Sequence, residues 1–200
     1  MKLWYAKPSP FARKALVIIL EAGLSSRVDL LEVEPATLEA KVCGDNPLGK
    51  IPCLITDDDE RLFDSRVICE YLDVTFNEAR LHPTPGPARW AALRLQALAD
   101  GIMDAAVSYR YESLRPDSEA SPAWMTRQRG KITRALDHLE ATPPVHAPIT
   151  MGEIALACAL DYVDLRIADL AWRSTRPHLA RWAETIAERP ALLASAPGCP

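Results

Sequence analysis

The first part of the chain alternates between short apolar runs and an amphipathic segment. Apolar and aromatic residues fill Lys2–Ala6, and polar and apolar positions alternate over Arg27–Val33, which is typical of strands. Between them, Phe11–Ala22 has apolar residues at helical spacing and precedes Gly23, a residue favoured just after a helix end. The pattern predicts a strand, a helix and a second strand, and a right-handed crossover would make the two strands parallel.

The next segments predict two more helices and a hairpin. Pro35–Val42 has a weak helical pattern, and Ser65–Phe76 is amphipathic at helical spacing. Between these segments, the short apolar runs Cys53–Thr56 and Arg61–Phe63 flank an acidic turn at Asp57–Asp59. The order strand, helix, strand, helix, strand, strand, helix predicts a thioredoxin-like α/β domain.

The composition changes at residues 79–87, where three prolines and a glycine lie close together. No strand pattern recurs beyond this stretch. Helices are predicted over Ala88–Leu114, Pro122–Ala141, Thr150–Ala171 and His178–Glu188. We therefore predict a thioredoxin-like domain at residues 1–78, a linker at 79–87 and an all-α helical-bundle domain at 88–200, with a loose tail over Ala194–Pro200.

One of these helices has a specific start signal. Thr150 and Glu153 are spaced as a capping box, with Ile149 and Ile154 at the hydrophobic-staple positions. The segment that follows is apolar nearly all round, so we expect this helix at the centre of the second domain.

Charge and hydropathy narrow the choice of partners. The 200 residues include 23 Lys and Arg and 27 Asp and Glu, for a net charge of −4, without a long basic run. This balance argues against nucleic acid or an anionic membrane as the main partner. The apolar run Ala15–Leu20 is too short to span a membrane, and Lys7 and Arg13 break any signal-peptide layout. We expect a cytoplasmic protein.

Five cysteines occur, an odd number, and no two are spaced as C-x-x-C. This pattern favours neither a disulfide framework nor a zinc site, so we expect mostly buried thiols and no metal. The exception is Cys199, which lies in a Pro- and Gly-containing tail and is expected to be exposed.

The stretch Ser9–Lys14, S-P-F-A-R-K, lies between the first strand and the first helix. The N-terminus of a helix presents unpaired N–H groups and a partial positive charge, so a hydroxyl there can help to hold an anion such as a thiolate. Ser9 equally fits a plain helix N-cap, and this stretch alone leaves both interpretations open.

A second stretch, N-P-L-G-K-I-P-C-L, leads into the third strand. Pro52 follows the β-branched Ile51, a place where a cis peptide can occur. A cis bond would turn the N–H and C=O of Ile51 outward, where they could pair with a peptide-like ligand, and Lys50 would add a cation for a carboxylate. An ordinary loop is the alternative.

The third stretch, Phe63-Asp64-Ser65, ends the hairpin and begins a helix. Ser65 as the N-cap would direct backbone N–H groups toward an anion, and Asp64 could accept a hydrogen bond from an ammonium. Together they match the head group of an amino acid. Simple helix capping explains the same residues.

These motifs, in this order and followed by a proline-rich linker and a helical domain, resemble the cytosolic glutathione transferase family. The resemblance covers essentially the whole chain and includes the capping box T-x-x-E-I-A-L-A-C. The chain looks most similar to small bacterial members, in which S-P-F occupies the place of the C-P-F of the omega class.

The resemblance implies glutathione as co-substrate. Ser9 matches the residue that stabilises the glutathione thiolate, and Phe11 lies in the same motif. Ile51 matches the residue whose backbone pairs with the cysteinyl part of glutathione, and Pro52 matches the cis-proline. Lys50 lies where several classes carry a polar side chain near the glycyl carboxylate.

The same resemblance implies that Asp64 and Ser65 hold the γ-glutamyl group and that the protein is a homodimer. In several classes an aspartate of the first long helix reaches the partner subunit's ligand, and Asp104 and Asp100, one turn apart, are the candidates. The family commonly has Glu where this chain has the shorter Asp64.

Ser9 in place of cysteine argues against mixed-disulfide chemistry and favours transfer of glutathione to a small hydrophobic electrophile, or glutathione-dependent peroxide reduction. Residues expected near that second substrate are Met103, Val107, Tyr109 and Tyr111. Two alternatives remain: a non-enzymatic interaction or stress protein of this fold, and a thiol–disulfide oxidoreductase.

Overall fold

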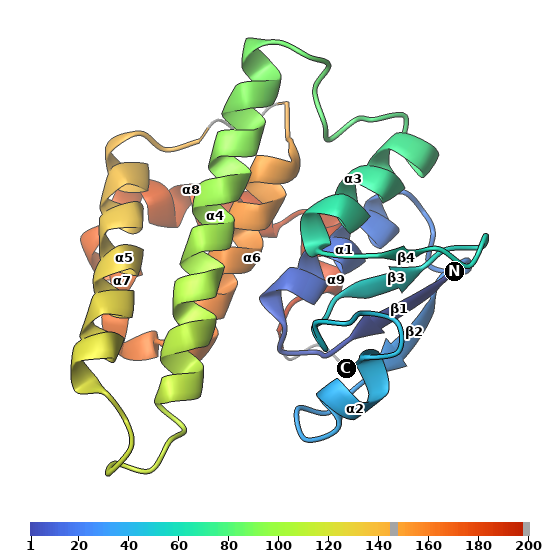
Figure 1. Ribbon diagram of the computed structural model, residues 1–200. Coiled ribbons are helices and arrows are strands. Elements are labelled where there is room, and N and C mark those ends of the chain that lie inside the picture. Colours follow the sequence, from blue (N-terminus) through green and yellow to red (C-terminus); the bar gives the residue numbers. More distant parts are fainter. Residues whose placement is uncertain (145–147, 198–200) are drawn as a thin grey trace. The chain divides into compact units, whose positions relative to one another are not determined.

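The computed structural model describes residues 1–144 and 148–197, which form two compact units (Figure 1). The first unit comprises residues 1–89 together with the segment that starts at Pro190, and the second comprises Trp90–Arg189. Cys199 lies outside the described residues. The predicted fold class, a thioredoxin-like domain and a helical domain, is confirmed, whereas the limits 1–78, 79–87 and 88–200 stay a prediction.

The first unit is built on a four-stranded mixed sheet in the order β2-β1-β3-β4. The strands are β1 (Lys2–Tyr5), β2 (Asp29–Glu32), β3 (Cys53–Ile55) and β4 (Arg61–Leu62). As predicted, β1 and β2 are parallel, and β3 and β4 form an antiparallel hairpin. β3 also pairs antiparallel with β1, so the sheet is continuous.

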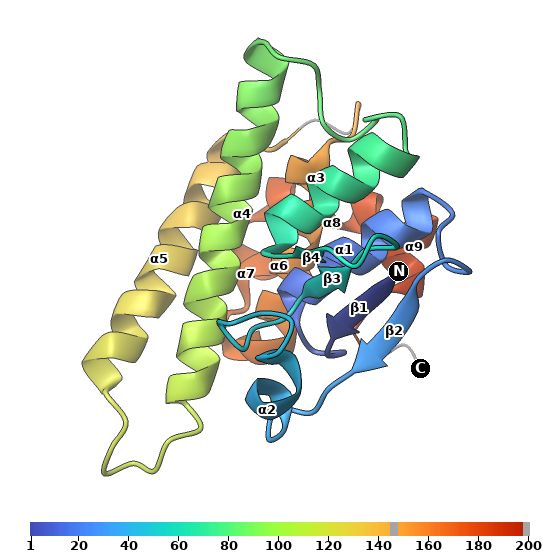
Figure 2. The ribbon, with the colours of Figure 1, turned by 45° about the vertical axis from the view of Figure 1, so that its right-hand side comes forward.

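Helices cover both faces of this sheet. Packed against each other on one face are α1 (Pro10–Glu21) and α3 (Ser65–Phe76), while α2 (Leu38–Val42) lies on the other face (Figure 2). The side chains of β1 alternate accordingly, because Leu3 is fully buried whereas Trp4 packs with the cluster that contains Val42 of α2.

The C-terminal helix α9 (Pro190–Ala194) packs against α1. Arg13, 4% exposed, donates hydrogen bonds from Nε to the Ser195 carbonyl (2.8 Å) and from Nη2 to the Leu192 carbonyl (3.1 Å). The expectation of a loose tail from Ala194 is therefore wrong for its first residues, because a buried guanidinium binds the carbonyls that end α9.

The second unit is helical. Its elements are α4 (Pro87–Glu112, whose first three residues lie in the first unit), α5 (Pro122–Ala141), α6 (Met151–Arg166), the 3₁₀ turn η1 (Ala168–Leu170), α7 (Trp172–Thr175) and α8 (Pro177–Ala187). As predicted, α6 lies centrally, and every residue from Met151 to Leu160 is buried. None of the described helices is long and apolar enough to cross a membrane.

The predicted capping box at the start of α6 is present. The Thr150 N–H donates to Glu153 Oε2 (2.8 Å), and the Gly152 N–H donates to Thr150 Oγ1 (3.1 Å). A Cβ on Gly152 would lie 2.8 Å from the carbonyl oxygen of Ala92 in α4. Only glycine therefore allows the first turn of α6 to approach α4 this closely.

The predicted end of α6 is wrong, since the helix stops at Arg166 and not at Ala171. The chain turns through η1 and returns to α6, where Trp172 is buried and donates from Nε1 to Asp164 Oδ1 (2.6 Å). Arg173 donates to the other oxygen of the same carboxylate (2.7 Å). These contacts fix the chain that follows the helix end at Arg166.

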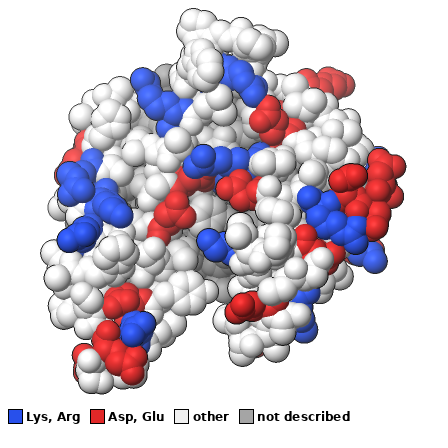
Figure 3. Space-filling model, viewed as in Figure 1, with Lys and Arg blue, Asp and Glu red and all other residues white. Residues whose placement is uncertain are grey.

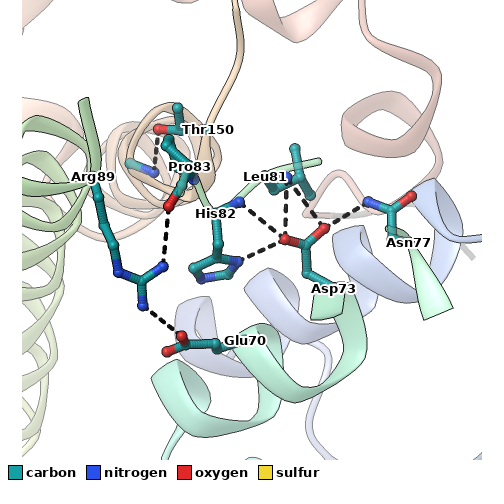
Figure 4. Close-up of polar contacts among 9 residues, drawn as sticks. Glu70, Asp73, Asn77, Leu81, His82, Pro83, Arg89 and Thr150 are labelled. Atoms are coloured by element: carbon teal, nitrogen blue, oxygen red, sulfur yellow. Dashed lines mark hydrogen bonds and ion pairs between the residues drawn. The ribbon is translucent and has the colours of Figure 1, made fainter. Parts of the chain in front are cut away.

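A buried carboxylate fixes the start of the segment that leaves α3 (Figure 4). Asp73 is fully buried and accepts hydrogen bonds from the N–H groups of Leu81 and His82 (3.1 and 3.0 Å), from His82 Nδ1 (2.8 Å) and from Asn77 Nδ2 (2.8 Å). The proline-rich stretch is thus held to α3 at its first residues.

Replacing Asp73 with alanine should remove this acceptor and leave several buried donors unpaired. Hydrogen bonds to a charged group contribute about 1.5–3 kcal/mol each, so we expect a loss of roughly 3–5 kcal/mol in the free energy of unfolding. Urea unfolding followed by circular dichroism measures it. The matched control is Asp58→Ala at an exposed turn, where the change should be within about 0.5 kcal/mol. Equal losses of unfolding free energy in the two variants would contradict the role of Asp73 as the acceptor that holds this segment.

Candidate functional site

Strand register brings the three predicted ligand-binding stretches to one edge of the sheet. Trp4 near the end of β1 pairs with Cys53 at the start of β3, and Leu54 of β3 pairs with Leu62 at the end of β4. The residues that follow β1, precede β3 and follow β4 therefore lie at the same edge. These segments are the ones that contain Ser9, Ile51 and Asp64.

Ser9 is the N-cap of α1. Its Oγ accepts a hydrogen bond from the Ala12 N–H (3.2 Å), so the capping interpretation is correct as geometry. A hydroxyl has two acceptor lone pairs and one donor hydrogen, so capping leaves the Ser9 hydrogen available for an anion. The first turn of α1 has no acidic residue to offset its positive end. Phe11, half-buried, follows in this turn.

The loop before β3 is held by a buried side chain that the sequence analysis did not single out. Asn46, 1% exposed, donates from Nδ2 to the Lys50 carbonyl (2.7 Å) and accepts from the Leu48 N–H (3.0 Å). Gly49 has φ +60°, and a Cβ there would lie 3.1 Å from Cγ of Glu39. The N-P-x-G spacing is therefore the local requirement for this turn.

The predicted cis peptide is present between Ile51 and Pro52. Within residues 1–144 and 148–197, no hydrogen bond joins the main-chain N–H or C=O of Ile51 to another residue. The side chain of Ile51 packs on the cluster around Val42 and Cys53. Its backbone is therefore fixed by packing while its polar groups stay available, and the Lys50 side chain is exposed.

A second residue that fixes this loop, after Asn46, lies just before it. Asp45 accepts hydrogen bonds from Trp4 Nε1 (2.7 Å) and from Arg61 Nε (3.2 Å), so one carboxylate joins the loop to β1 and β4. No local sequence pattern predicts this role, because the three residues are far apart along the chain.

The third stretch, Phe63-Asp64-Ser65, differs from the prediction in the identity of the helix N-cap. Asp64 and not Ser65 is the N-cap of α3, and its Oδ1 accepts from the Arg66 N–H (2.9 Å). Aspartate caps as well as serine does, and the extended backbone at Asp64 suits that position. Ser65 becomes the first helical residue and is 2% exposed, whereas Asp64 is exposed. The Phe63–Asp64 peptide is also cis.

The candidate residues on α4 differ in exposure. Asp100 is 2% exposed and Asp104 is exposed, so only Asp104 is accessible enough for the expected contact with a partner subunit, which stays a prediction. Met103 is fully buried in the core, whereas Tyr111 is 59% exposed.

The cysteines are not equally buried. Cys53, Cys69 and Cys158 are buried as expected, but Cys43 is exposed at the end of α2. Burial, reinforced by the nearby Asp45 carboxylate, raises the pKa of the Cys53 thiol to about 11. Cys53 is therefore a poor nucleophile at neutral pH. Among the described residues, no group of three or more His, Cys, Asp or Glu side chains is arranged to hold a metal ion.

Charge is not concentrated on the face shown in Figure 3, where basic and acidic side chains are interspersed and neither sign covers a large area. This face therefore carries no broad field of one sign.

Comparison with known families agrees with this geometry. Residues 8–75 match the family model "Glutathione S-transferase, N-terminal domain", and residues 122–185 match "Glutathione S-transferase, C-terminal domain". The chain belongs to the glutathione S-transferase family. Its assignment to an S-P-F subtype stays a prediction.

Three relatives illustrate the range of this family. The chain is 34% identical to the uncharacterized GST-like protein YibF of Escherichia coli, over 94% of this chain and 95% of the relative. It is 30% identical to a stringent starvation protein A homologue of Pasteurella multocida, over 86% and 74%. A glutathione transferase family member from Pseudomonas fluorescens, solved with bound glutathione, is 44% identical over 98% of both chains, with a TM-score of 0.93.

The raised pKa of Cys53 predicts selective alkylation. Because its thiol stays protonated well above neutral pH and is buried, iodoacetamide should leave Cys53 unmodified between pH 7 and 9, while the exposed Cys43 reacts. Peptide mass spectrometry after brief labelling measures both sites, and labelling in urea is the control that should modify them alike. Rapid modification of native Cys53 would contradict this account.

Proposed function

We propose that this protein is a glutathione transferase that stabilises the glutathione thiolate with Ser9 and conjugates it to a small electrophile. The observation that supports this most directly is the shared sheet edge: Ser9, Ile51 and Ser65 come from three separate stretches and meet there by strand register. The Pseudomonas fluorescens relative, which has bound glutathione, supports the choice of ligand.

Glutathione would extend along this edge. The free N–H and C=O of Ile51 would pair with its cysteinyl residue as an added strand does, and Lys50 would attract the glycyl carboxylate. The first turn of α3 at Ser65 would bind the γ-glutamyl carboxylate, and Asp64 would accept a hydrogen bond from the ammonium group.

Asp64 can cap α3 and bind the ammonium group at the same time. Only its Oδ1 is used to cap α3, so Oδ2 remains for the ammonium. The shorter reach of aspartate relative to glutamate is offset by its place at the cap itself, where the side chain need not extend away from the helix.

The chemical step needs an ionised thiol. A free thiol has a pKa near 8.5, so at neutral pH only a few per cent is thiolate. The Ser9 hydroxyl and the positive end of α1 favour the anion. The thiolate then forms a carbon–sulfur bond with the electrophile, whose leaving group departs with the bonding electron pair, or whose activated double bond takes up a proton from water.

A second structure of the Pseudomonas fluorescens protein, 42% identical with a TM-score of 0.88, has bound S-(propanoic acid)-glutathione. That ligand is glutathione substituted at sulfur, which is the product class that conjugation yields. It supports transfer over thiol–disulfide exchange, as does the buried, weakly acidic thiol of Cys53. Glutathione-dependent peroxide reduction would use the same thiolate.

We further propose a cytoplasmic homodimer. On α3, Val67 and Val74 are 47% and 55% exposed and lie seven residues apart on one face of the helix. Such apolar positions suit a contact between subunits. A non-enzymatic stress or interaction protein is the second candidate, favoured by the similarity to the stringent starvation protein A homologue.

Replacing Ser9 with alanine should lower kcat/KM at neutral pH by roughly one to four orders of magnitude, because the thiolate loses its hydrogen-bond donor. The assay is conjugation of 1-chloro-2,4-dinitrobenzene. The matched control is Ser26→Ala, an exposed serine of the same unit, which should leave the rate unchanged.

The pH profile separates the thiolate role of Ser9 from a purely structural one. If Ser9 favours the thiolate, the variant should regain activity as the pH rises toward the pKa of free glutathione. A uniform loss at all pH values would assign Ser9 to folding only. Retention of the wild type on immobilised glutathione without turnover of any electrophile would favour the interaction protein.

A further inference from the structure

Four polar side chains meet at the C-terminal ends of α4 and α6, within the second unit. The two helices start side by side, because Gly152 of α6 lies against Ala92 and Leu95 of α4, and they run in the same direction (Figure 1). Their last turns therefore lie at the same end of this unit. The four side chains are Arg110 and Tyr111 from α4 and Tyr162 and Arg166 from α6.

Tyr162 is the centre of this cluster. It is 7% exposed, and the guanidinium carbon of Arg166 lies 5.8 Å from the centroid of its ring. Arg110 and Tyr111 also interact electrostatically with its hydroxyl. Burial raises the pKa of Tyr162, an effect that Arg166 and Arg110 oppose, so the phenol is a neutral hydrogen-bond donor at physiological pH.

The charges of the two arginines are not balanced by ion pairs within the described chain. In the described parts of the chain, no carboxylate forms an ion pair with Arg110 or Arg166, and Arg166 Nε is buried without a hydrogen-bond partner. Arg173 and Arg176, which are also at least partly buried, are paired with Asp164 (2.7 Å) and Asp137 (2.6 Å). The other arginines of this unit for which the described chain supplies no ion pair are exposed, namely Arg94, Arg127, Arg134 and Arg181. A partly buried cation without a counter-ion is costly, so these two positions favour a bound anion.

Helix dipoles do not account for both cations. Arg110 and Arg166 each lie in the last turn of their helix, where the partial charge is about −0.5. Two helix ends therefore offset about one of the two positive charges. The positive charge that remains lies next to the Tyr162 hydroxyl, and the ring of Tyr111 is 59% exposed.

We propose that this cluster binds the carboxylate of an aromatic carboxylic acid. Guanidinium forks match the two oxygens of a carboxylate, the Tyr162 hydroxyl adds a third donor, and Tyr111 offers a ring face to the body of the ligand.

The site is tested without glutathione. Isothermal titration calorimetry at low salt compares 3-nitrobenzoate with 3-nitrobenzamide, which has the same shape but no charge. We expect the wild type to bind the benzoate at least tenfold more tightly. Arg166→Ala and Arg110→Ala should each weaken benzoate binding about ten- to hundredfold, as loss of a hydrogen bond to a charged group does, and leave the amide within threefold.

The control is Arg94→Ala, an exposed arginine of α4 outside the cluster, which should bind both compounds as the wild type does. Near-UV circular dichroism verifies that each variant is folded, and the two variants on different helices guard against a single folding failure. Equal affinity of the wild type for both compounds would overturn the proposal. An equal loss of affinity for the benzoate and the amide in the variants would overturn it as well.

Discussion

The antiparallel pairing of β3 with both of its neighbours is the constraint on which the candidate glutathione site depends. Because Trp4 is opposite Cys53 and Leu54 is opposite Leu62, the segments that leave β1, enter β3 and leave β4 share one edge. A shift of one residue in either pairing would turn the strand side chains to the opposite faces, exposing Leu54 and displacing these segments. Asn46 and Asp45 then fix the intervening loop with buried or partly buried hydrogen bonds, so the Ile51 backbone is presented on a rigid support.

At both helix starts, structural and functional interpretations of the same residue turn out to be compatible. Ser9 caps α1 as an acceptor, and a hydroxyl that accepts still has a hydrogen to donate. Asp64 caps α3 with one oxygen and keeps the other. Capping also fixes the rotamer of each side chain, which reduces the entropy that binding would otherwise cost. Capping and ligand binding are therefore not competing explanations of these serine and aspartate residues, because capping would position each group for the proposed binding.

Much of the fold and of the candidate site could be predicted from the sequence. The physical reasons for this also explain which predictions were wrong. Periodicity and turn residues are local, so the order of strands and helices, the capping box at Thr150 and the cis bond before Pro52 were accessible. The end of α6 depends on Trp172 returning to Asp164, and the order of the last residues depends on Arg13, which is nearly 180 positions away along the chain. Such contacts leave no local pattern. The cap at Asp64 was missed because serine and aspartate cap about equally well.

The arginines of the helical unit show the same difference between local sequence patterns and contacts that only the fold creates. In the sequence, no local pattern distinguishes Arg110, Arg166, Arg173 and Arg176. Only the fold divides them, since Asp164 and Asp137 reach two of them and no carboxylate of the described chain reaches the other two. A helix end stabilises one cation by a few tenths of a kcal/mol to about 1 kcal/mol, which is less than the cost of an unsatisfied buried donor such as Arg166 Nε. The pairing pattern therefore identifies a surface adapted to an anion that the chain itself does not supply.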